Sequence, residues 1–361
     1  MRREFLQLAK KFEMGKHDPS GMYISEKLDG TRVFWDGGIT RGMPTAQVPW
    51  ASVINPKTGE FKPKIKPIST GLWSRYGNPI IAPDWWLNRL PCMFLDGELF
   101  AGRGNFQTLR SIVAKDVADE EAWRDVVFAV FGTPSGDDVF RAGEIKNSNF
   151  HLKVEPKVIG DFWDERVEAG AIADFMCLDS MTFEEEINVL QSALVGDDLC
   201  YLHQHVKLPD DRSAAEDHMG RFMDVVLDQG GEGVMLRDPQ SIWTPKRVNT
   251  LLKLKPFTDD CGTVTGFVSG RETNKGSKLR GLIGALILRY GDKRLELSGF
   301  TDEERRFADE EMTAYAYQHP GEEMPGHFIG KHFGIGDTVE FRYRELSDDG
   351  IPKEARYLRK T

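Results

Sequence analysis

A lysine in a short glycine-containing turn is the residue of this chain best suited to chemistry. Lys27 opens the hexamer Lys27-Leu28-Asp29-Gly30-Thr31-Arg32. A lysine amine can act as a nitrogen nucleophile, and an Asp-Gly pair lets the backbone turn sharply and approach a nucleotide closely. The fork of Arg32 fits phosphate oxygens. The hexamer therefore predicts an amine that attacks a phosphate, and a charged surface turn is the alternative.

Two acidic residues lie in turns of similar composition. Glu98 follows a glycine in Asp96-Gly97-Glu98-Leu99, and Glu232 lies between Gly231 and Gly233. A carboxylate at Glu98 can accept a hydrogen bond from a ribose hydroxyl or help to hold a metal ion, although a strand-end acid in a surface turn has the same pattern. Mg²⁺ prefers carboxylate and phosphate oxygens, so both acids are candidate ligands for Mg²⁺ or Mn²⁺.

Further residues could hold the phosphates and the base of a nucleotide. Lys253 and Lys255 are two apart and point to the same face if they lie on a strand. Their ammonium groups repel each other unless an anion lies between them, which predicts a triphosphate there. Arg75 is either another phosphate contact or a solvated arginine. Phe131, in an apolar run, is either a stacking platform for a base or part of the core.

Cys200, His203 and His205 resemble a metal site only superficially, because a fourth ligand is missing. We interpret the His-x-His segment as a half-exposed strand. The four cysteines contain no C-x-x-C pair, which argues against zinc and against a disulfide framework.

Length and composition indicate a globular chain of two domains. Its 361 residues exceed the roughly 250–300 that one core supports. No apolar run approaches the ~18 residues of a membrane span, and the start lacks a secretory signal. We therefore expect a cytoplasmic protein without a membrane partner, and a monomer by default.

The chain is acidic overall, with a net charge of −10. A nucleic acid would therefore have to meet a local basic surface. Residues 246–296 hold eleven Lys and Arg against five Asp and Glu. A solvated charged face is the alternative explanation for this excess.

Apolar spacing predicts the elements that position these residues. Strands are expected at 23–26, 32–35, 93–100, 126–131, 233–237 and 251–254, and helices at 5–13, 183–194 and 213–229. Five prolines between 41 and 72 predict a loop-rich insertion.

After Pro256 the sequence pattern changes to short apolar segments separated by glycines and charged turns. Short strands are expected at 262–268, 285–290, 295–300 and 337–343, with one helix at 301–317 that begins at a capping box formed by Thr301 and Glu304. This pattern fits a small β-barrel of the OB type. We therefore expect domains at 1–256 and 257–361.

The order of the motifs resembles ATP-dependent DNA ligases, most closely the small two-domain bacterial and phage enzymes that include relatives of kinetoplast ligases. Six segments carry the resemblance: the Lys27 hexamer, Ser74-Arg75-Tyr76-Gly77, Asp96-Gly97-Glu98-Leu99, Phe128-Ala129-Val130-Phe131, Glu232-Gly233-Val234-Met235 and Leu252-Lys253-Leu254-Lys255. The segments that begin at Gly102 and Gly281 are also similar to that group.

The resemblance implies an α+β fold, with an adenylation (nucleotidyltransferase) domain of antiparallel sheets and helices followed by the OB-fold barrel. It implies that ATP and Mg²⁺ or Mn²⁺ are used to seal nicks in double-stranded DNA through a lysyl-AMP intermediate at Lys27. The implied ATP- or AMP-binding residues are Glu26, Arg32, Arg75, Glu98, Phe131, Lys253 and Lys255. The implied metal ligands are Glu98, Glu232 and Asp29. The expected DNA contacts are Arg32, Arg75, Arg103, Lys275, Lys278 and Arg280.

The chain departs from the family pattern in a few places. Gly132 stands where relatives have Asp after the aromatic residue, and Ser25 stands where many have the Glu that reads adenine, with Glu26 next to it. Residues 41–72 and 145–180 resemble insertions. An RNA ligase, an mRNA-capping guanylyltransferase and a catalytically silent nick-binding protein are the alternative functions.

Overall fold

The chain divides into two compact units, Met1–Leu254 and Lys255–Thr361. The computed structural model describes residues 6–48, 50–53, 60, 62, 64–140, 178–272, 278–347 and 349–361. The division lies two residues before the domain boundary expected from the sequence. Most of the possible insertion at 145–180 lies outside the described residues. Among the helices that are described, none is long and apolar enough to cross a membrane.

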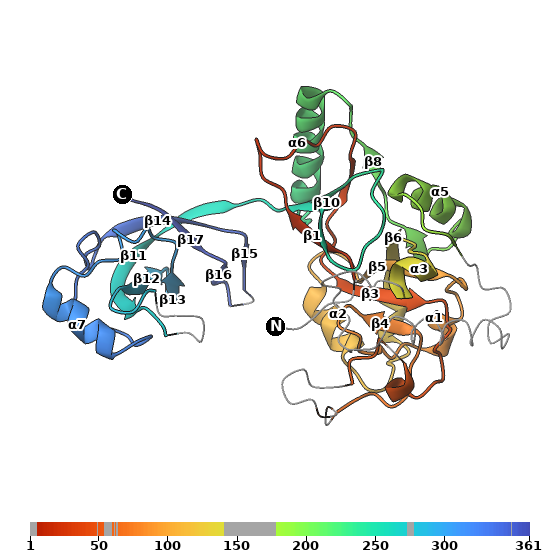
Figure 1. Cartoon of the computed structure of the whole chain (residues 1–361), viewed down its shortest axis with the longest axis horizontal. Coiled ribbons are helices and arrows are strands. Elements are labelled where there is room, and N and C mark those ends of the chain that lie inside the picture. The colour runs from red at the N-terminus through yellow and green to blue at the C-terminus, as the bar shows by residue number, and fades with distance from the viewer. Residues whose placement is uncertain are drawn as a thin grey trace. The chain divides into compact units, whose positions relative to one another are not determined.

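Unit 1 contains two five-stranded sheets (Figure 1). Sheet I has the order β1 (Leu8–Lys11), β10 (Arg247–Leu254), β9 (Val234–Arg237), β2 (Tyr23–Glu26), β8 (Val206–Lys207). Sheet II has the order β4 (Leu72–Ser74), β3 (Thr31–Asp36), β5 (Phe94–Phe100), β6 (Val127–Gly132), β7 (Cys200–Leu202). The pairs β1–β10 and β6–β7 are parallel, and the other pairs are antiparallel, so the sheets are mixed rather than purely antiparallel.

Two short connections cross between the sheets. Residues 27–30 lead from β2 in sheet I to β3 in sheet II, and residues 203–205 lead from β7 in sheet II back to β8 in sheet I. Side chains on these crossings can therefore reach the space between the two sheets.

The long helix α6 (Arg212–Asp228) covers the outer face of sheet I (Figure 1). Its Met219 and Met223 pack in one apolar cluster with Ile24 of β2 and Leu236 of β9. Because side chains alternate along a strand, burying these residues on the outer face turns Ser25 and Met235 to the inner face. The alternation thus decides which residues of sheet I face sheet II.

Sheet II is packed against α2 (Phe106–Val113) and α5 (Phe183–Ala193). Leu109 of α2 and Leu190 of α5 share an apolar cluster with Val33, Leu99 and Phe128 of the sheet. The shorter helices of the unit are η1 (Thr45–Gln47), α1 (Asp84–Leu87), η2 (Ala122–Asp125) and α3 (Gly136–Phe140). Helix α5 begins at the capping box of Thr182 and Glu185.

The helix expected at residues 5–13 is wrong. The described part of this segment contains the strand β1, which pairs in parallel with β10 through Leu8 and Arg247. Leu6 and Phe12 are buried at either end of it. The spacing of these apolar residues is compatible with a helix or with a strand. The segment forms a strand because the edge of sheet I supplies backbone hydrogen-bond partners.

Unit 2 is a five-stranded antiparallel sheet around its own apolar core. Its order is β13 (Lys293–Leu297), β12 (Ile283–Tyr290), β11 (Thr258–Ser269), β14 (Thr338–Tyr343), β17 (Arg356–Lys360). A small hairpin of β15 (Glu345–Leu346) and β16 (Pro352–Lys353) and the helix α7 (Glu310–Gln318) complete it. Phe267, Leu286 and Phe341 form the centre of the core, as expected for a small β-domain.

The helix expected at 301–317 begins later than predicted. Thr301 and Glu304 do form their reciprocal hydrogen bonds, but α7 starts at Glu310 with Asp309 as its N-cap. Between them, Arg305 donates to the carbonyl of Ile283, and Phe307 is buried and bridges to Gly330. These contacts hold residues 301–309 out of the helix.

Candidate active site

A cavity of about 380 Å³ lies within unit 1, in the size range of small-molecule sites. Both sheets and both crossings contribute to its wall. The lining residues are Leu8, Ala9, Ser25, Glu26, Lys27, Leu28, Arg32, Arg75, Glu98, Phe131, His203, His205, Met235, Arg237, Arg247, Leu251 and Lys253.

Most of the residues selected from the sequence meet in this cavity. Glu26, Lys27, Arg32, Arg75, Glu98, Phe131 and Lys253 all line it. Glu232 reaches Lys27, whereas Asp29 is exposed on the turn. Lys255 is the first residue of unit 2, so its contact with a nucleotide stays a prediction.

Lys27 is fixed by the pairing of β2 with β9. These strands are antiparallel with Glu26 opposite Val234, and the backbone N–H of Lys27 donates to the carbonyl of Gly233 at 2.8 Å. The register brings Lys27 beside Glu232, and the Lys27 Nζ forms an ion pair with the Glu232 carboxylate. The Lys27 side chain is 22% exposed, and its exposed part faces the cavity.

Gly30 is required by a close contact with the backbone of the neighbouring strand. A Cβ atom at this position would lie 2.1 Å from the carbonyl oxygen of Leu99 and 2.7 Å from the Cγ of Glu98. Any other residue would push the turn off β5. The glycine therefore holds the Lys27 turn directly against the strand that carries Glu98, and the expectation that it serves the approach of a nucleotide stays a prediction.

Arg32 is held by a buried carboxylate. Its Nε and Nη2 donate to the two oxygens of Asp96 at 2.6 and 2.7 Å, and the indole of Trp243 donates to Asp96 at 2.8 Å. The Arg32 guanidinium also lies 4.5 Å from the centre of the Phe131 ring. In this structure the Arg32 guanidinium binds the Asp96 carboxylate. The phosphate and DNA contacts expected of Arg32 therefore stay predictions.

The Glu98 carboxylate is held in an unusual charge state. Burial raises the pKa of Glu98 to about 7, although Arg32, Lys27 and Arg75 lower it. The three cations are therefore close enough to act on this acid, yet they do not fully offset the loss of water. An additional cation at this position would favour the ionised form.

The raised pKa makes a prediction for stability. A carboxyl group whose pKa rises on folding stabilises the fold below its unfolded pKa of about 4.5, and this contribution is lost as pH rises through about 7. We expect Glu98→Gln to stabilise unit 1 relative to the wild type increasingly between pH 5 and pH 8. Thermal unfolding followed by tryptophan fluorescence measures this, and a pH-independent difference would contradict the assignment.

Glu26 and Arg103 were expected to bind different ligands, ATP and DNA, but they bind each other. The Arg103 Nε and Nη2 donate to the Glu26 carboxylate at 2.8 and 2.7 Å. Arg75 is exposed and donates to the hydroxyl of Tyr76 at 2.8 Å. Their roles toward ATP and DNA stay predictions.

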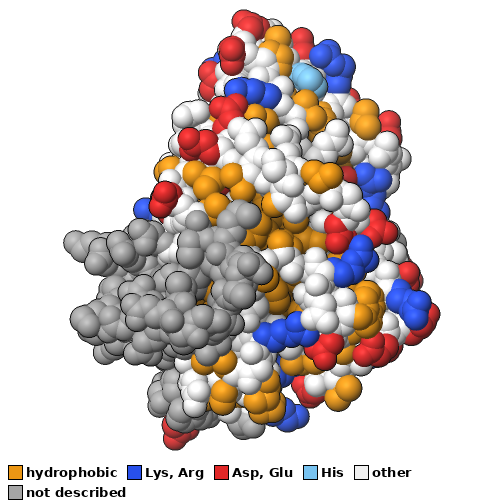
Figure 2. All heavy atoms as spheres, turned by 90° about the vertical axis from the view of Figure 1, so that its right-hand side faces the viewer, with side chains coloured by type: hydrophobic (Ala, Val, Ile, Leu, Met, Phe, Trp, Pro, Cys, Tyr) orange, Lys and Arg blue, Asp and Glu red, His pale blue; other side chains and the backbone are white. Residues whose placement is uncertain are grey.

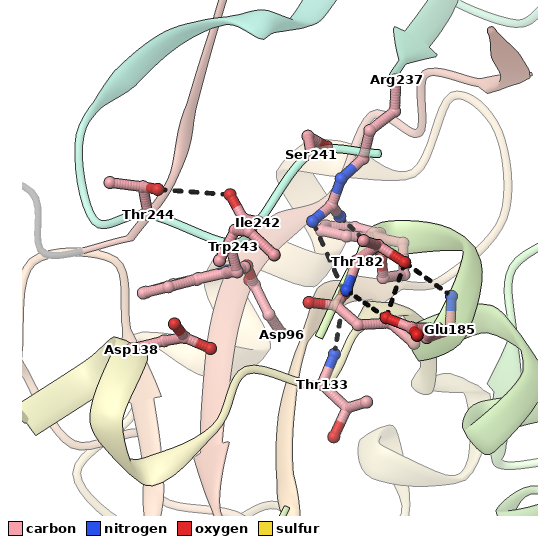
Figure 3. Close-up of polar contacts among 12 residues, drawn as sticks. Asp96, Thr133, Asp138, Thr182, Glu185, Arg237, Ser241, Ile242, Trp243 and Thr244 are labelled. Carbon is pink, nitrogen blue, oxygen red and sulfur yellow. Dashed lines mark hydrogen bonds and ion pairs between the residues drawn. The ribbon is translucent and has the colours of Figure 1, made fainter. Parts of the chain in front are cut away.

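Arg237 and Glu186 form a buried ion pair next to the backbone of Phe131. Figure 3 shows the Arg237 side chain extending from β9 toward the segments around Thr133 and Thr182. Its Nη1 donates to the carbonyl of Phe131 at 3.1 Å, and its Nη2 lies 3.5 Å from Glu186 of α5. Burial raises the pKa of Glu186 to about 7 despite Arg237.

This pair also lies close to Gly132. A Cβ at Gly132 would lie 3.3 Å from the Glu186 carboxylate and 3.5 Å from the Arg237 guanidinium.

Sequence reasoning missed four polar residues of the site. Asp96 is the acid that orients Arg32, and its position within Asp96-Gly97-Glu98 was the signal that could have identified it. Arg237 ends the strand that follows Glu232. His203 and His205 had been interpreted as an ordinary strand, but they lie on the crossing from β7 to β8 and line the cavity.

Within the described residues, no group of three or more His, Cys, Asp and Glu side chains could hold a metal ion. The set expected from the sequence, Glu98, Glu232 and Asp29, therefore does not form a protein-only metal site. Mg²⁺ commonly takes one or two carboxylates and completes its shell with water and substrate phosphate, so metal binding by Glu98 and Glu232 stays a prediction.

The DNA contacts expected in unit 2 are only partly described. Lys275 lies outside the described residues. Lys278 is exposed and forms an ion pair with Asp302 at 2.9 Å, and Arg280 lies over the Tyr317 ring at 4.2 Å. Both remain candidates for DNA contact.

Comparison with known proteins identifies similar chains. Residues 275–360 match the family model described as DNA ligase OB-like domain. A DNA ligase of Haemophilus influenzae is 22% identical over 342 residues, which cover 94% of this chain and 86% of that protein.

Solved structures with the same fold include one from a structure–function study of Lig E DNA ligases that bind DNA with a minimal scaffold. It has a TM-score of 0.58 at 21% identity and covers 99% of this chain and 98% of its own. A second, Pmar-Lig, has a TM-score of 0.54 at 18% identity, covering 100% of this chain and 68% of its own. The expected fold class, a mixed α and β domain followed by an OB-like domain, is confirmed.

Proposed function

We propose that this chain is an ATP-dependent DNA ligase of the minimal type, in which unit 1 is the adenylation domain and unit 2 the OB-like domain. The similar proteins are DNA ligases across nearly the whole length of the chain. The cavity of unit 1 is then the site at which ATP is consumed.

The observation that carries the proposal is the convergence of distant residues on one cavity. Lys27, Glu98, Phe131 and Lys253 are spread over more than half of the chain, and the two sheets bring them together around about 380 Å³ of space. A nucleophile, an acid, an aromatic ring and a cation are the parts that a covalent nucleotidyl transfer requires.

In the first step, the Lys27 amine attacks the α-phosphorus of ATP. A nitrogen–phosphorus bond forms, the bond to the β-phosphate bridging oxygen breaks, and pyrophosphate leaves. We propose that Lys253, which also lines the cavity, offsets the negative charge of the phosphates and that Phe131 stacks on the base. Such catalysis is largely positioning and electrostatic stabilisation.

Glu98 and Glu232 would hold a Mg²⁺ or Mn²⁺ ion. The fit rests on the donor set, because Mg²⁺ prefers carboxylate oxygens and Glu98 lines the cavity. When bound, the ion would offset charge on the transferring phosphoryl group. We propose that Glu232, which forms an ion pair with Lys27, also orients the amine and accepts its proton.

In the remaining steps the AMP passes to DNA. The 5′-phosphate of a nick displaces Lys27 from the AMP phosphorus, and the 3′-hydroxyl on the other side of the same nick then attacks the 5′-phosphate and releases AMP. We expect backbone contacts without sequence preference, and hence a steep dependence of binding on salt.

The charges on unit 1 do not single out the face in Figure 2 for DNA binding. On that face, positive and negative side chains are interspersed with apolar ones, as on an ordinary solvated surface. We place the duplex instead at the mouth of the cavity, near Arg75 and Arg103. A monomeric state and a cytoplasmic location are also part of the proposal.

A nick-sealing assay tests this function. We expect a labelled nicked DNA duplex to be sealed with ATP and Mg²⁺, and not with GTP or NAD in place of ATP. A matched duplex with RNA strands at the nick separates DNA ligation from RNA ligation. Sealing of the RNA nick alone, or labelling of the protein by GTP in preference to ATP, would overturn the proposal.

A further inference from the structure

Two histidine rings form part of the cavity wall beside the proposed base platform. His203 and His205 lie on the crossing between β7 and β8, and both line the cavity with Phe131 and Met235. The backbone N–H of His203 donates to the carbonyl of Val130 at 2.7 Å, which places the crossing next to the strand that carries Phe131.

The hydrogen bonds fix which nitrogen of each ring carries a proton. The His203 Nε2 lies 2.8 Å from the carbonyl oxygen of Glu26, and the His205 Nδ1 lies 2.7 Å from the carbonyl oxygen of His203. A carbonyl oxygen only accepts, so these two nitrogens are the donors. The remaining nitrogens are then His203 Nδ1 and His205 Nε2.

Both rings are neutral at physiological pH. Burial lowers the pKa of His205 to about 3, with His203 and Arg237 acting in the same direction, and burial also lowers the pKa of His203. In a neutral ring the nitrogen without a proton is a hydrogen-bond acceptor. In the described part of the chain no group bonds to His205 Nε2, and the ring is only half-buried.

We propose that His205 determines which base the cavity accepts, with its Nε2 accepting a hydrogen bond from the exocyclic amino group at C6 of adenine. This inference rests on the proposed function, because it assigns the base of the nucleotide that Lys27 attacks. It also provides a base-reading group in a chain that has Ser25 where relatives carry a glutamate.

The chemistry of the two purines explains why an acceptor selects adenine. Adenine presents an N–H donor at C6, whereas guanine presents a carbonyl oxygen there. Two acceptors facing each other leave both without a partner in a partly buried site, which costs more than the loss of one hydrogen bond. The ring packing supports a fixed position for His205, because its ring meets the rings of Phe183 and His203 edge to face at 5.2 and 5.7 Å.

The test compares two nucleotides on matched proteins. The probes are ATP and purine riboside triphosphate, which lacks only the amino group, and the readout is kcat/KM for formation of the Lys27 adduct. We expect the wild type to prefer ATP by about tenfold, the value of one hydrogen bond. We expect His205→Phe, which keeps the ring contact with Phe183, to use both nucleotides equally.

Three controls make the result specific. His205→Gln keeps an acceptor and should restore part of the preference, and His218→Phe, on α6 outside the cavity, should leave it unchanged. If His205→Phe does not fold, His205→Leu replaces it. An equal preference for ATP in the wild type and in the apolar variant would overturn the role of His205.

The outcomes also separate this inference from the proposed function. A wild-type protein that forms no adduct with either nucleotide contradicts the ligase assignment itself. An adduct that forms readily on Lys27, with no dependence of base preference on His205, contradicts only the inference about the base.

Discussion

Lys27→Ala is expected to abolish the covalent AMP adduct. The variant lacks the amine that forms the nitrogen–phosphorus bond, which lines the cavity and pairs with Glu232. Loss of a nucleophile typically lowers the rate by on the order of 10⁴-fold or more. Intact-protein mass spectrometry after incubation with ATP and Mg²⁺ measures the adduct directly.

The control for this variant is an exposed lysine of unit 1. Lys16 is 67% exposed and pairs with Glu13, so Lys16→Ala should form the adduct at the wild-type rate. Tryptophan fluorescence checks that Lys27→Ala remains folded. An undiminished adduct on folded Lys27→Ala protein would remove the basis of the proposed mechanism.

Asp96→Asn is expected to destabilise unit 1 by about 3 kcal/mol. The Asp96 side chain is 1% exposed and binds both nitrogens of the Arg32 fork. Asparagine keeps the shape of the side chain but removes the negative charge that Asp96 offers to the largely buried Arg32 fork. Removing one member of such a pair costs more than the pair itself contributes, because the remaining charge stays desolvated.

The stability of unit 1 can be measured separately because of where the tryptophans lie in the chain. All eight tryptophans of the chain lie before residue 255, so urea unfolding followed by tryptophan fluorescence reports on unit 1 alone. Asp84→Asn is the matched control, because Asp84 is 86% exposed and its ion pair with Arg41 is at the surface. That variant should change stability by less than about 1 kcal/mol. Equal effects of the two substitutions would contradict the role assigned to Asp96.

The strands around the Lys27 turn could be predicted because their pattern is local. Residues 23–26 and 32–35 alternate in the way a half-buried strand requires, and the structure has β2 and β3 there. The turn between them follows from Asp29-Gly30. What the sequence did not reveal is that Gly30 is needed for contact with Leu99, since this contact joins segments about 70 residues apart.

The two helix predictions that differ from the structure were wrong for the same reason. Residues 5–13 and 301–309 carry local helix signals, and tertiary contacts override both. Leu8 pairs with Arg247 at the edge of sheet I, and Arg305 binds the carbonyl of Ile283. Local propensity is worth tenths of a kcal/mol per residue, which is less than such contacts contribute together.

The candidate site was predictable where family motifs mark it and not elsewhere. Seven of the residues implied by the resemblance line the cavity, although their individual roles stay predictions. His203 and His205 carry no motif, and a His-x-His pattern has the same appearance on a surface strand. Only the path of the chain from one sheet to the other brings these rings to the cavity.

The two crossings between the sheets have a consequence for the resistance of the protein to proteolysis in the cell. Because Lys27 lies on one crossing and the histidines on the other, any occupant of the cavity ties the two halves of unit 1 together. A freely bound ligand at 100 times its Kd adds about 2.7 kcal/mol of stability, and it is lost when its concentration falls. AMP attached covalently to Lys27 cannot dissociate in this way, so a pre-charged enzyme would outlast the empty one against proteolysis when nucleotide is scarce.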